Sequence, residues 1–98
     1  MSRGDALLLL AAADDVAVTL RPVARGERLR VAGAALVAAD EIPFAHKIAL
    51  RPIAAGAAVR KFGVPIGRAT ADIAPGAWVH VHNIASDYIN NALEHFED

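Results

Sequence analysis

The chain has 98 residues, of which 55% are hydrophobic and 21% are charged, and its formal net charge is −1. A chain of this length and composition forms one domain with a modest core, and its high apolar content excludes a disordered polypeptide. We therefore predict a single domain over residues 1–98. The ten cations are spread along the chain, so no basic stripe indicates a nucleic-acid partner. Cysteine is absent, which excludes disulfides and thiolate metal ligands.

The first apolar run, residues 6–13, is too short to cross a membrane, which takes about 20 apolar residues. Its flank is nearly neutral and it is shorter than a secretory signal of ~15–30 residues. We interpret it as a buried strand and expect a cytoplasmic protein without a membrane partner. Much of the apolar content is alanine, whose small side chain leaves little room for a private ligand cavity. This composition favours a site shared with another chain.

A short motif occurs three times, beginning at Val23, Ile53 and Ile73. It consists of a β-branched residue, alanine, any residue, glycine, two variable residues and then leucine or valine. The β-branched residue can enter the core, glycine accepts the positive φ of a tight reversal, and the last apolar residue can start a strand. Many short strands with tight connections predict an all-β fold. The uneven spacing of the copies argues against a solenoid.

Apolar runs between turn residues place most of the strands. The segment 31–40 is ambiguous, because its alanines favour a helix whereas Gly33 and the all-β context do not. A turn is expected at Asp14-Asp15. The predicted strands are 6–10, 16–20, 47–50, 59–62, 65–69 (bounded by Gly63 and Gly67) and 78–82.

The tail has a different pattern. After Ser86, a capping residue, apolar side chains recur at the spacing of an amphipathic helix. We expect this helical tail within residues 85–98, with its apolar face covering either the domain's own sheet or a partner. The apolar residues are Ile89, Ala92, Leu93 and Phe96.

Two histidines stand two positions apart near the end of the last predicted strand. Side chains alternate along a strand, so His80 and His82 would share one face while Val79 and Val81 take the other. Two imidazoles on one face can bind a divalent metal or relay protons, and Asn83 can orient a ligand or a substrate hydroxyl. A solvent-facing strand without function is the alternative, because the pair lacks the further ligands of a metal site.

Two other places suit an anionic ligand. His46-Lys47 lies where a loop enters a strand, so Lys47 can supply a positive charge and His46 a donor or a base. Lys61 precedes Phe62-Gly63, where the glycine either lets a ligand approach the backbone or forms an ordinary turn, which is the commoner case. Taken alone, His46-Lys47 is better explained as ordinary solvent-exposed polar residues. No complete catalytic triad or three-ligand metal set occurs, so these residues form at most part of an active site.

From His46 to Asn83 the chain resembles the N-terminal domain of altronate and galactarate dehydratases. The same domain occurs as a free small subunit in relatives such as the sulfolactate sulfo-lyase alpha chain, and SAF-type domains of sialic acid synthases are more remotely similar. Residues 15–29 also fit the domain's first strand and turn. In order, the shared elements are His-Lys, an Ile-x-x-Gly turn, Lys-aromatic-Gly, Ile-Gly, a second Ile-x-x-Gly turn and Val-His-x-His-Asn.

The resemblance implies a small β-clip (SAF-like) domain and a role in cytoplasmic sugar-acid breakdown. It implies the small subunit of a hydro-lyase, inactive without a large catalytic subunit, and a divalent metal, Fe²⁺ or Mn²⁺, in the complete enzyme. The reaction would be β-elimination from a hydroxy acid, with a base removing the proton next to the carboxylate. By resemblance, the candidates are His80 and His82 for catalysis and metal binding, and His46, Lys47, Lys61 and Asn83 for substrate binding.

Two other functions stay open. The chain can be a stand-alone module that binds a carbohydrate or sugar acid without catalysis. It can also be a structural domain that forms homo-oligomers or docks a partner through the helical tail, with incidental histidines. The substrate is undetermined among altronate, galactarate, sulfolactate and other hydroxy acids.

Overall fold

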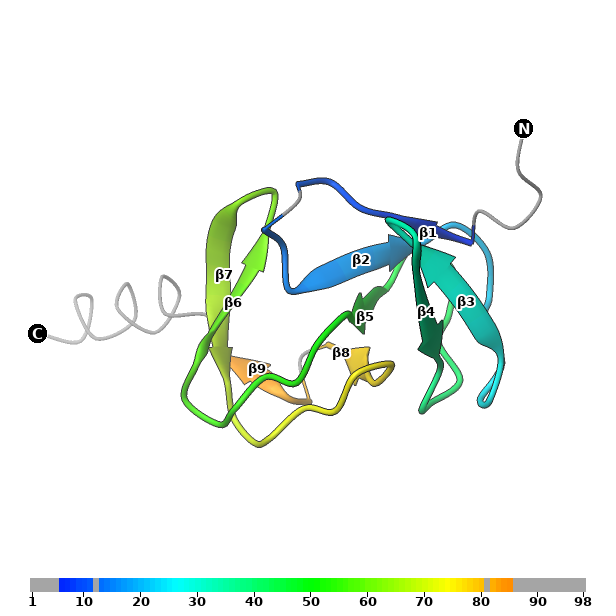
Figure 1. The fold of residues 1–98 in the computed structure, drawn as a ribbon. Coiled ribbons are helices and arrows are strands. Elements are labelled where there is room, and N and C mark those ends of the chain that lie inside the picture. Colours follow the sequence, from blue (N-terminus) through cyan, green and yellow to red (C-terminus); the bar gives the residue numbers. More distant parts are fainter. Residues whose placement is uncertain (1–5, 12, 81, 86–98) are drawn as a thin grey trace, which may run out of the picture.

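The computed structural model describes residues 6–11, 13–80 and 82–85, and these residues form an all-β fold, as predicted (Figure 1). Within these ranges there is no helix, and hence none that could span a membrane. The helix expected in the tail lies outside the described residues. The strands are β1 (Leu7–Leu8), β2 (Val16–Thr19), β3 (Arg28–Val31), β4 (Ala34–Val37), β5 (Lys47–Ala49), β6 (Ala58–Lys61), β7 (Val64–Ala69), β8 (Trp78–Val79) and β9 (Ile84–Ala85).

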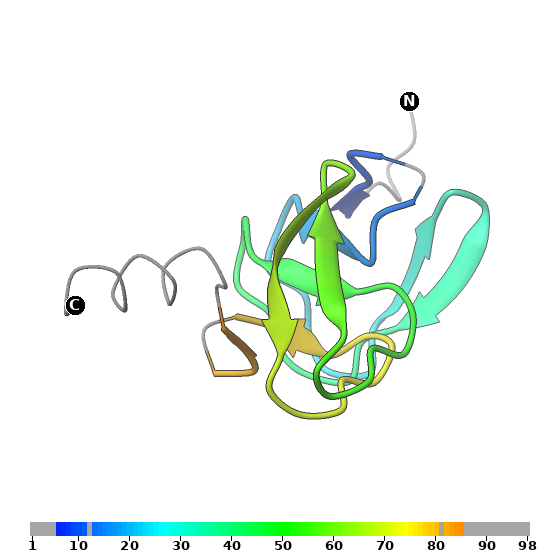
Figure 2. The ribbon, with the colours of Figure 1, turned by 90° about the vertical axis from the view of Figure 1, so that its left-hand side faces the viewer.

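The strands form three small antiparallel sheets. The central sheet has the order β1-β2-β5-β8, β3 pairs with β4, and β9 extends the hairpin of β6 and β7. Figure 1 shows the central sheet between the two hairpins, with β3–β4 on one side and β6–β7 on the other. Figure 2 looks onto the β6–β7 side. Strands distant in sequence therefore meet in the central sheet.

Residues 19–48 and 49–79 fold alike. Each stretch passes through a turn, a two-stranded hairpin and a second turn before it re-enters the central sheet. In each stretch the two turns are joined by reciprocal backbone hydrogen bonds of 2.7–2.9 Å. This internal repeat explains the uneven spacing of the turn motif, because the motif occurs twice in each stretch. The joined residues are Val23 with Ile42 and Ile53 with Ile73.

The copy at residues 42–45 was missed in the sequence because it contains no glycine. Ala45 has a φ of 68° where the other three turns have glycine with φ of 83–85°. A left-handed conformation costs a residue with a Cβ roughly 1–2 kcal/mol. Buried Thr19 holds this turn closed, since its hydroxyl donates to the Pro43 carbonyl at 2.7 Å and accepts from the His46 amide at 3.1 Å. The turn therefore delivers His46 to the start of β5.

The alanine-rich segment 31–40 is not a helix but the end of β3, a turn and β4. Ala32 and Gly33 both have positive φ, 51° and 81°, which is the geometry of a two-residue hairpin loop. Leu36 is buried against the core, so cross-strand pairing and burial outweigh the helix propensity of alanine. Phe62-Gly63 repeats this loop between β6 and β7, with φ of 61° and 72°. Of the two readings of Phe62-Gly63, the ordinary turn is therefore confirmed.

Gly67 was expected to bound a strand, but it lies inside β7 (Val64–Ala69). The pairing of β6 with β7 shifts register at this point, so β7 contains one residue that has no partner in β6. The strand therefore continues past Gly67. Pro65 has no amide hydrogen for its partner Arg60. Asp15 replaces the missing strand hydrogen bonds of Arg60. Its carboxylate accepts the Arg60 amide at 2.9 Å, and its own amide donates to the Arg60 carbonyl at 3.1 Å.

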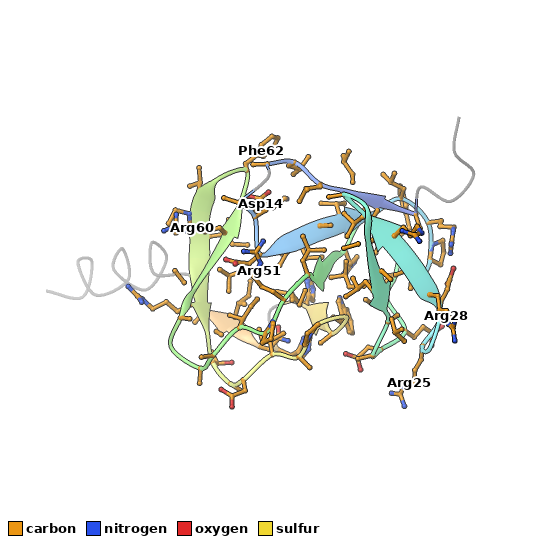
Figure 3. All side chains as sticks on the ribbon, in the orientation of Figure 1. Asp14, Arg25, Arg28, Arg51, Arg60 and Phe62 are labelled. Atoms are coloured by element: carbon orange, nitrogen blue, oxygen red, sulfur yellow. The ribbon has the colours of Figure 1, made fainter. Side chains whose placement is uncertain are left out.

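Asp14 anchors the β6–β7 hairpin to the segment before β2, as Figure 3 shows. Its carboxylate is fully buried and accepts the amides of Gly63 at 2.7 Å, Phe62 at 2.8 Å and Ala11 at 3.2 Å. Burial alone would raise the pKa of Asp14, but these hydrogen bonds and the nearby Arg51 outweigh it and hold the pKa below its usual value.

The core consists of two clusters of small aliphatic side chains, one for each half of the repeat. β5 contributes a side chain to each cluster, because its neighbouring residues Ile48 and Ala49 are fully buried and belong to different clusters. Trp78 packs at the edge of the first cluster. The strand that carries Trp78 is thus supported by the core while its polar neighbours stay accessible.

Candidate functional site

Trp78 lies at the centre of a group of three histidines. Its ring centroid is 5.6 Å from that of His46, 5.5 Å from His80 and 5.2 Å from His82. The ring of His80 is nearly parallel to the indole, with an interplanar angle of 8°, and it also lies 4.7 Å from His46. The structure therefore brings together three of the predicted site residues around a tryptophan that the sequence analysis did not select.

Three polar groups hold Trp78 in place. Its amide donates to the Asp40 carboxylate at 3.0 Å and its carbonyl accepts from the Asn83 carboxamide at 2.8 Å. The indole Nε1–H donates to Nδ1 of His46 at 3.1 Å. A partly buried indole needs a partner for its N–H, so a single tryptophan directly before the histidine pair was the signal that could have identified it.

The prediction that the last strand extends to His82 is wrong. β8 ends at Val79, and a turn follows in which the Asn83 amide donates to the His80 carbonyl at 3.0 Å. The Asn83 side chain accepts the His80 amide at 2.9 Å and thereby satisfies a group that strand pairing would otherwise satisfy. His80 and His82 do not share the face of a strand; they meet because both rings contact Trp78.

Asn83 was predicted to contact the substrate. Its carboxamide oxygen and nitrogen instead bind the backbone of His80 and Trp78. These bonds close the turn that carries both histidines, so Asn83 positions the site. A direct contact with a ligand stays a prediction.

Lys47 supplies positive charge beside His80, and Lys61 lies near enough to Lys47 to affect its pKa. Lys47 is half-buried at the start of β5, where it pairs with Val79 of β8. Burial lowers the pKa of Lys47, and the charge of Lys61 lowers it further. Among the described residues, neither lysine forms an ion pair. A half-buried cation without a counter-ion is typical of a site that binds an anion.

His80 is affected by the same surroundings. Burial lowers its pKa below the usual histidine value, and the neighbouring His46, Lys47 and His82 lower it further. His80 is therefore neutral at physiological pH and can accept a proton or a hydrogen bond. His82 is more exposed than His80 and is accessible from outside the domain.

A complete metal site does not fit these residues. In the part of the chain that the structure describes, no group of three or more histidine, cysteine or acidic side chains is placed to hold a metal. Nδ1 of His46 is occupied by the indole N–H. His80 and His82 remain, and two imidazoles are fewer than a stable metal site requires.

An open groove of about 440 Å³ adjoins Trp78. A second groove, of about 540 Å³, lies at the corresponding place in the other half of the repeat, but no histidine or tryptophan lines it. The aromatic side chains of Phe44 and Trp78 thus distinguish the first groove from the second. The first is lined by Pro22, Glu41, Ile42, Pro43, Phe44 and Trp78.

Comparison with known families gives one match that covers most of the chain. A family model described as the altronate/galactarate dehydratase SAF domain matches residues 5–87. This range contains every described residue of the histidine group and both lysines.

Comparison with individual proteins agrees with the family match. The chain is 43% identical over 70 residues to an altronate dehydratase of Bacillus subtilis and 46% identical over 72 residues to one of Escherichia coli. These matches cover 71% and 74% of the chain but 14% of each relative. A (2R)-sulfolactate sulfo-lyase subunit alpha of Chromohalobacter salexigens is 47% identical over 45 residues, which are 46% of the chain and 48% of that subunit.

Proposed function

Because the chain belongs to the SAF domain family of altronate and galactarate dehydratases, we propose that it is the small subunit of a metal-dependent sugar-acid dehydratase. The chain spans about 14% of the altronate dehydratases it matches, so a large catalytic partner would supply the rest of such an enzyme. The naming of two similar chains as subunit alpha supports a multi-subunit assembly. We place this enzyme in the cytoplasm, which the absence of cysteine favours.

The observation that carries this proposal is the group of His46, Trp78, His80 and His82 beside Lys47 within a domain of this family. Lys61 adds a second positive charge near Lys47. The group combines positive charge with neutral imidazole, which suits a carboxylate whose neighbouring C–H is to be deprotonated. Its residues lie on an accessible surface beside an open groove, where a partner can complete an active site.

In this site the lysines would bind the carboxylate of a hydroxy acid and stabilise the charge that develops on it. The neutral His80 can accept a proton, and His82 is a second candidate for proton transfer. β-Elimination then requires departure of the β-hydroxyl as water. Asn83 would act through the turn that positions both histidines.

The divalent metal of the complete enzyme, Fe²⁺ or Mn²⁺, is proposed to be bound mainly by the partner. When bound, such an ion stabilises the negative charge on the substrate oxygens. His80 and His82 can supply at most two ligands to it, since the described residues do not form a site of their own.

The proposal is tested by combining the chain with a large subunit of this family and measuring dehydration of altronate and galactarate. We expect activity only with both chains, and a loss of about 100-fold or more for His82→Ala. Arg28→Ala, on the exposed face of the β3–β4 hairpin, is the control and should keep full activity. Unchanged activity of the His82→Ala enzyme would remove His82 from the site.

A stand-alone sugar-acid binding module is the second candidate. Half-buried Lys47 favours it, because this lysine forms no ion pair with another described residue. It requires the 98-residue chain to bind altronate or galactarate without a partner. Isothermal titration calorimetry of the isolated chain distinguishes the two functions. Saturable binding that is lost in Lys47→Met would support the module, and no heat of binding would support the shared site.

A further inference from the structure

We infer that Trp78 holds the ring of His46 in the tautomer that carries its proton on Nε2, so that His46 donates a hydrogen bond to the bound anion. The donor role rests on the proposed function, whereas the tautomer rests only on the geometry of this chain. Nε1 of Trp78 lies 3.1 Å from Nδ1 of His46. An indole N–H can only donate, so Nδ1 must accept. In a neutral imidazole the proton is then on Nε2.

Both partners of this hydrogen bond are fixed through their backbones. His46 follows a turn closed by the buried Thr19 hydroxyl, which accepts the His46 amide at 3.1 Å. The backbone of Trp78 is held by Asp40 on its amide and by Asn83 on its carbonyl. Three hydrogen-bonding groups therefore fix the backbones that place the indole N–H opposite Nδ1. An incidental contact between exposed side chains would not require them.

The tautomer separates the roles of the three imidazoles. Nε2–H of His46 has no lone pair for a metal or a proton, so His46 is neither a ligand nor a base in this arrangement. His46 directly precedes Lys47, and the two can meet one carboxylate as a neutral donor and a cation. Proton transfer is then left to His80 and His82.

The tautomer can be measured on the full chain by long-range ¹H–¹⁵N correlation NMR at alkaline pH, where the imidazoles are neutral. We expect Nδ1 of His46 to resonate as an unprotonated nitrogen and Nε2 as a protonated one. In Trp78→Phe, which keeps an aromatic ring but lacks the N–H, the signals should shift toward a mixture of tautomers. A protonated Nδ1 in the natural chain, or a pattern that is the same in the variant, would overturn the inference.

A matched pair of substitutions provides an independent measurement if Trp78→Phe does not fold. In His46→Asn, the side-chain oxygen takes the place of Nδ1 and keeps the acceptor for the indole N–H. In His46→Gln, the side-chain NH2 group takes the place of Nε2 and keeps the donor. The indole N–H signal of Trp78 should stay in its hydrogen-bonded position in His46→Asn and move in His46→Gln. The opposite order would contradict the inference.

In the assembled enzyme, His46→Asn should raise KM roughly tenfold, and His46→Gln should raise it less, because a donor to an anion is lost only in the former. Equal KM values would refute the donor role. If the assembled enzyme proves inactive, the proposed function fails, while the NMR result on the isolated chain still decides the tautomer.

Discussion

Gly76 and Gly56 occupy the same position of the turn motif and both have a φ of 85°. A Cβ on Gly56 would meet no atom within 4 Å, whereas a Cβ on Gly76 would lie 2.0 Å from the carbonyl oxygen of Val37. We expect Gly56→Ala to lower the free energy of unfolding by roughly 1–2 kcal/mol for the left-handed conformation alone. Gly76→Ala should lower it by about 3 kcal/mol or more, since backbone must move. Urea unfolding of both variants measures the difference, and equal losses would contradict the close contact.

Lys47 illustrates a conflict between stability and binding. Its folded-state pKa is lowered by burial and by Lys61, so the unfolded chain binds this proton more tightly and the charged lysine weakens the fold at neutral pH. We expect Lys47→Met to raise the melting temperature by roughly 2–5 °C while it weakens binding of the sugar acid. Arg30→Met, at an exposed position of β3, should give no such gain. A lower melting temperature for Lys47→Met would show that the lysine supports the fold.

Residue by residue, the sequence indicates the polar members of the group around Trp78 but not Trp78 at its centre. His46 and Lys47 were selected because they stand where a loop enters a strand, and the structure confirms that placement. Trp78 was not selected, because it was considered only as part of the turn motif and of the strand that follows. Its polar role depends on His46, which lies far away in the sequence and meets Trp78 through the pairing of β5 with β8.

At the scale of elements, the loop at the tip of the β6–β7 hairpin is held by the carboxylate of Asp14. Asp14 accepts three backbone amides, and its folded-state pKa lies below the usual value of about 3.9. Its contribution is thus present above about pH 4 and is lost as the pH falls through the folded-state pKa. Asp14→Asn should lower the melting temperature at pH 7 by roughly 5–10 °C. The melting temperature of this variant should also depend less on pH in the acid range than that of the natural chain.

The matched control for Asp14 is Asp72→Asn, because the exposed Asp72 accepts one backbone amide, that of Ala55, at 2.9 Å. Thermal unfolding followed by circular dichroism between pH 3 and pH 7 compares the two variants with the natural chain. An acid transition that is equally steep in Asp14→Asn and in the natural chain would assign acid sensitivity to other groups.

Most strands could be placed from sequence because apolar runs and turn glycines delimit them. The exceptions have local causes. β8 is short because the Asn83 side chain closes a turn directly after it. The strand in 34–37 was obscured by alanine, whose helix propensity is overridden here by pairing with β3. Gly67 falls within a strand because a register shift absorbs an extra residue there.

For the whole molecule, metal dependence separates the chain from its proposed assembly. The described residues offer two open imidazoles, so we expect the isolated chain to bind Mn²⁺ only weakly, with a dissociation constant of roughly 0.1 mM or higher. The assembled enzyme should lose activity on chelation and recover it with Fe²⁺ or Mn²⁺. Calorimetric titration of the isolated chain and activity after dialysis against a chelator measure the two properties. Micromolar binding by the isolated chain would contradict the shared site.

The amino-acid sequence by itself determined the all-β class, the turn motif and the family, because these depend on local patterns and on residues in a recognisable order. Only the tertiary structure decided that the repeating units are residues 19–48 and 49–79, and that Trp78 joins three histidines. Both depend on contacts between segments distant in sequence. The φ of Ala45 and the hydrogen bond between Trp78 and His46 are imposed by those contacts, and no local pattern of residues encodes them.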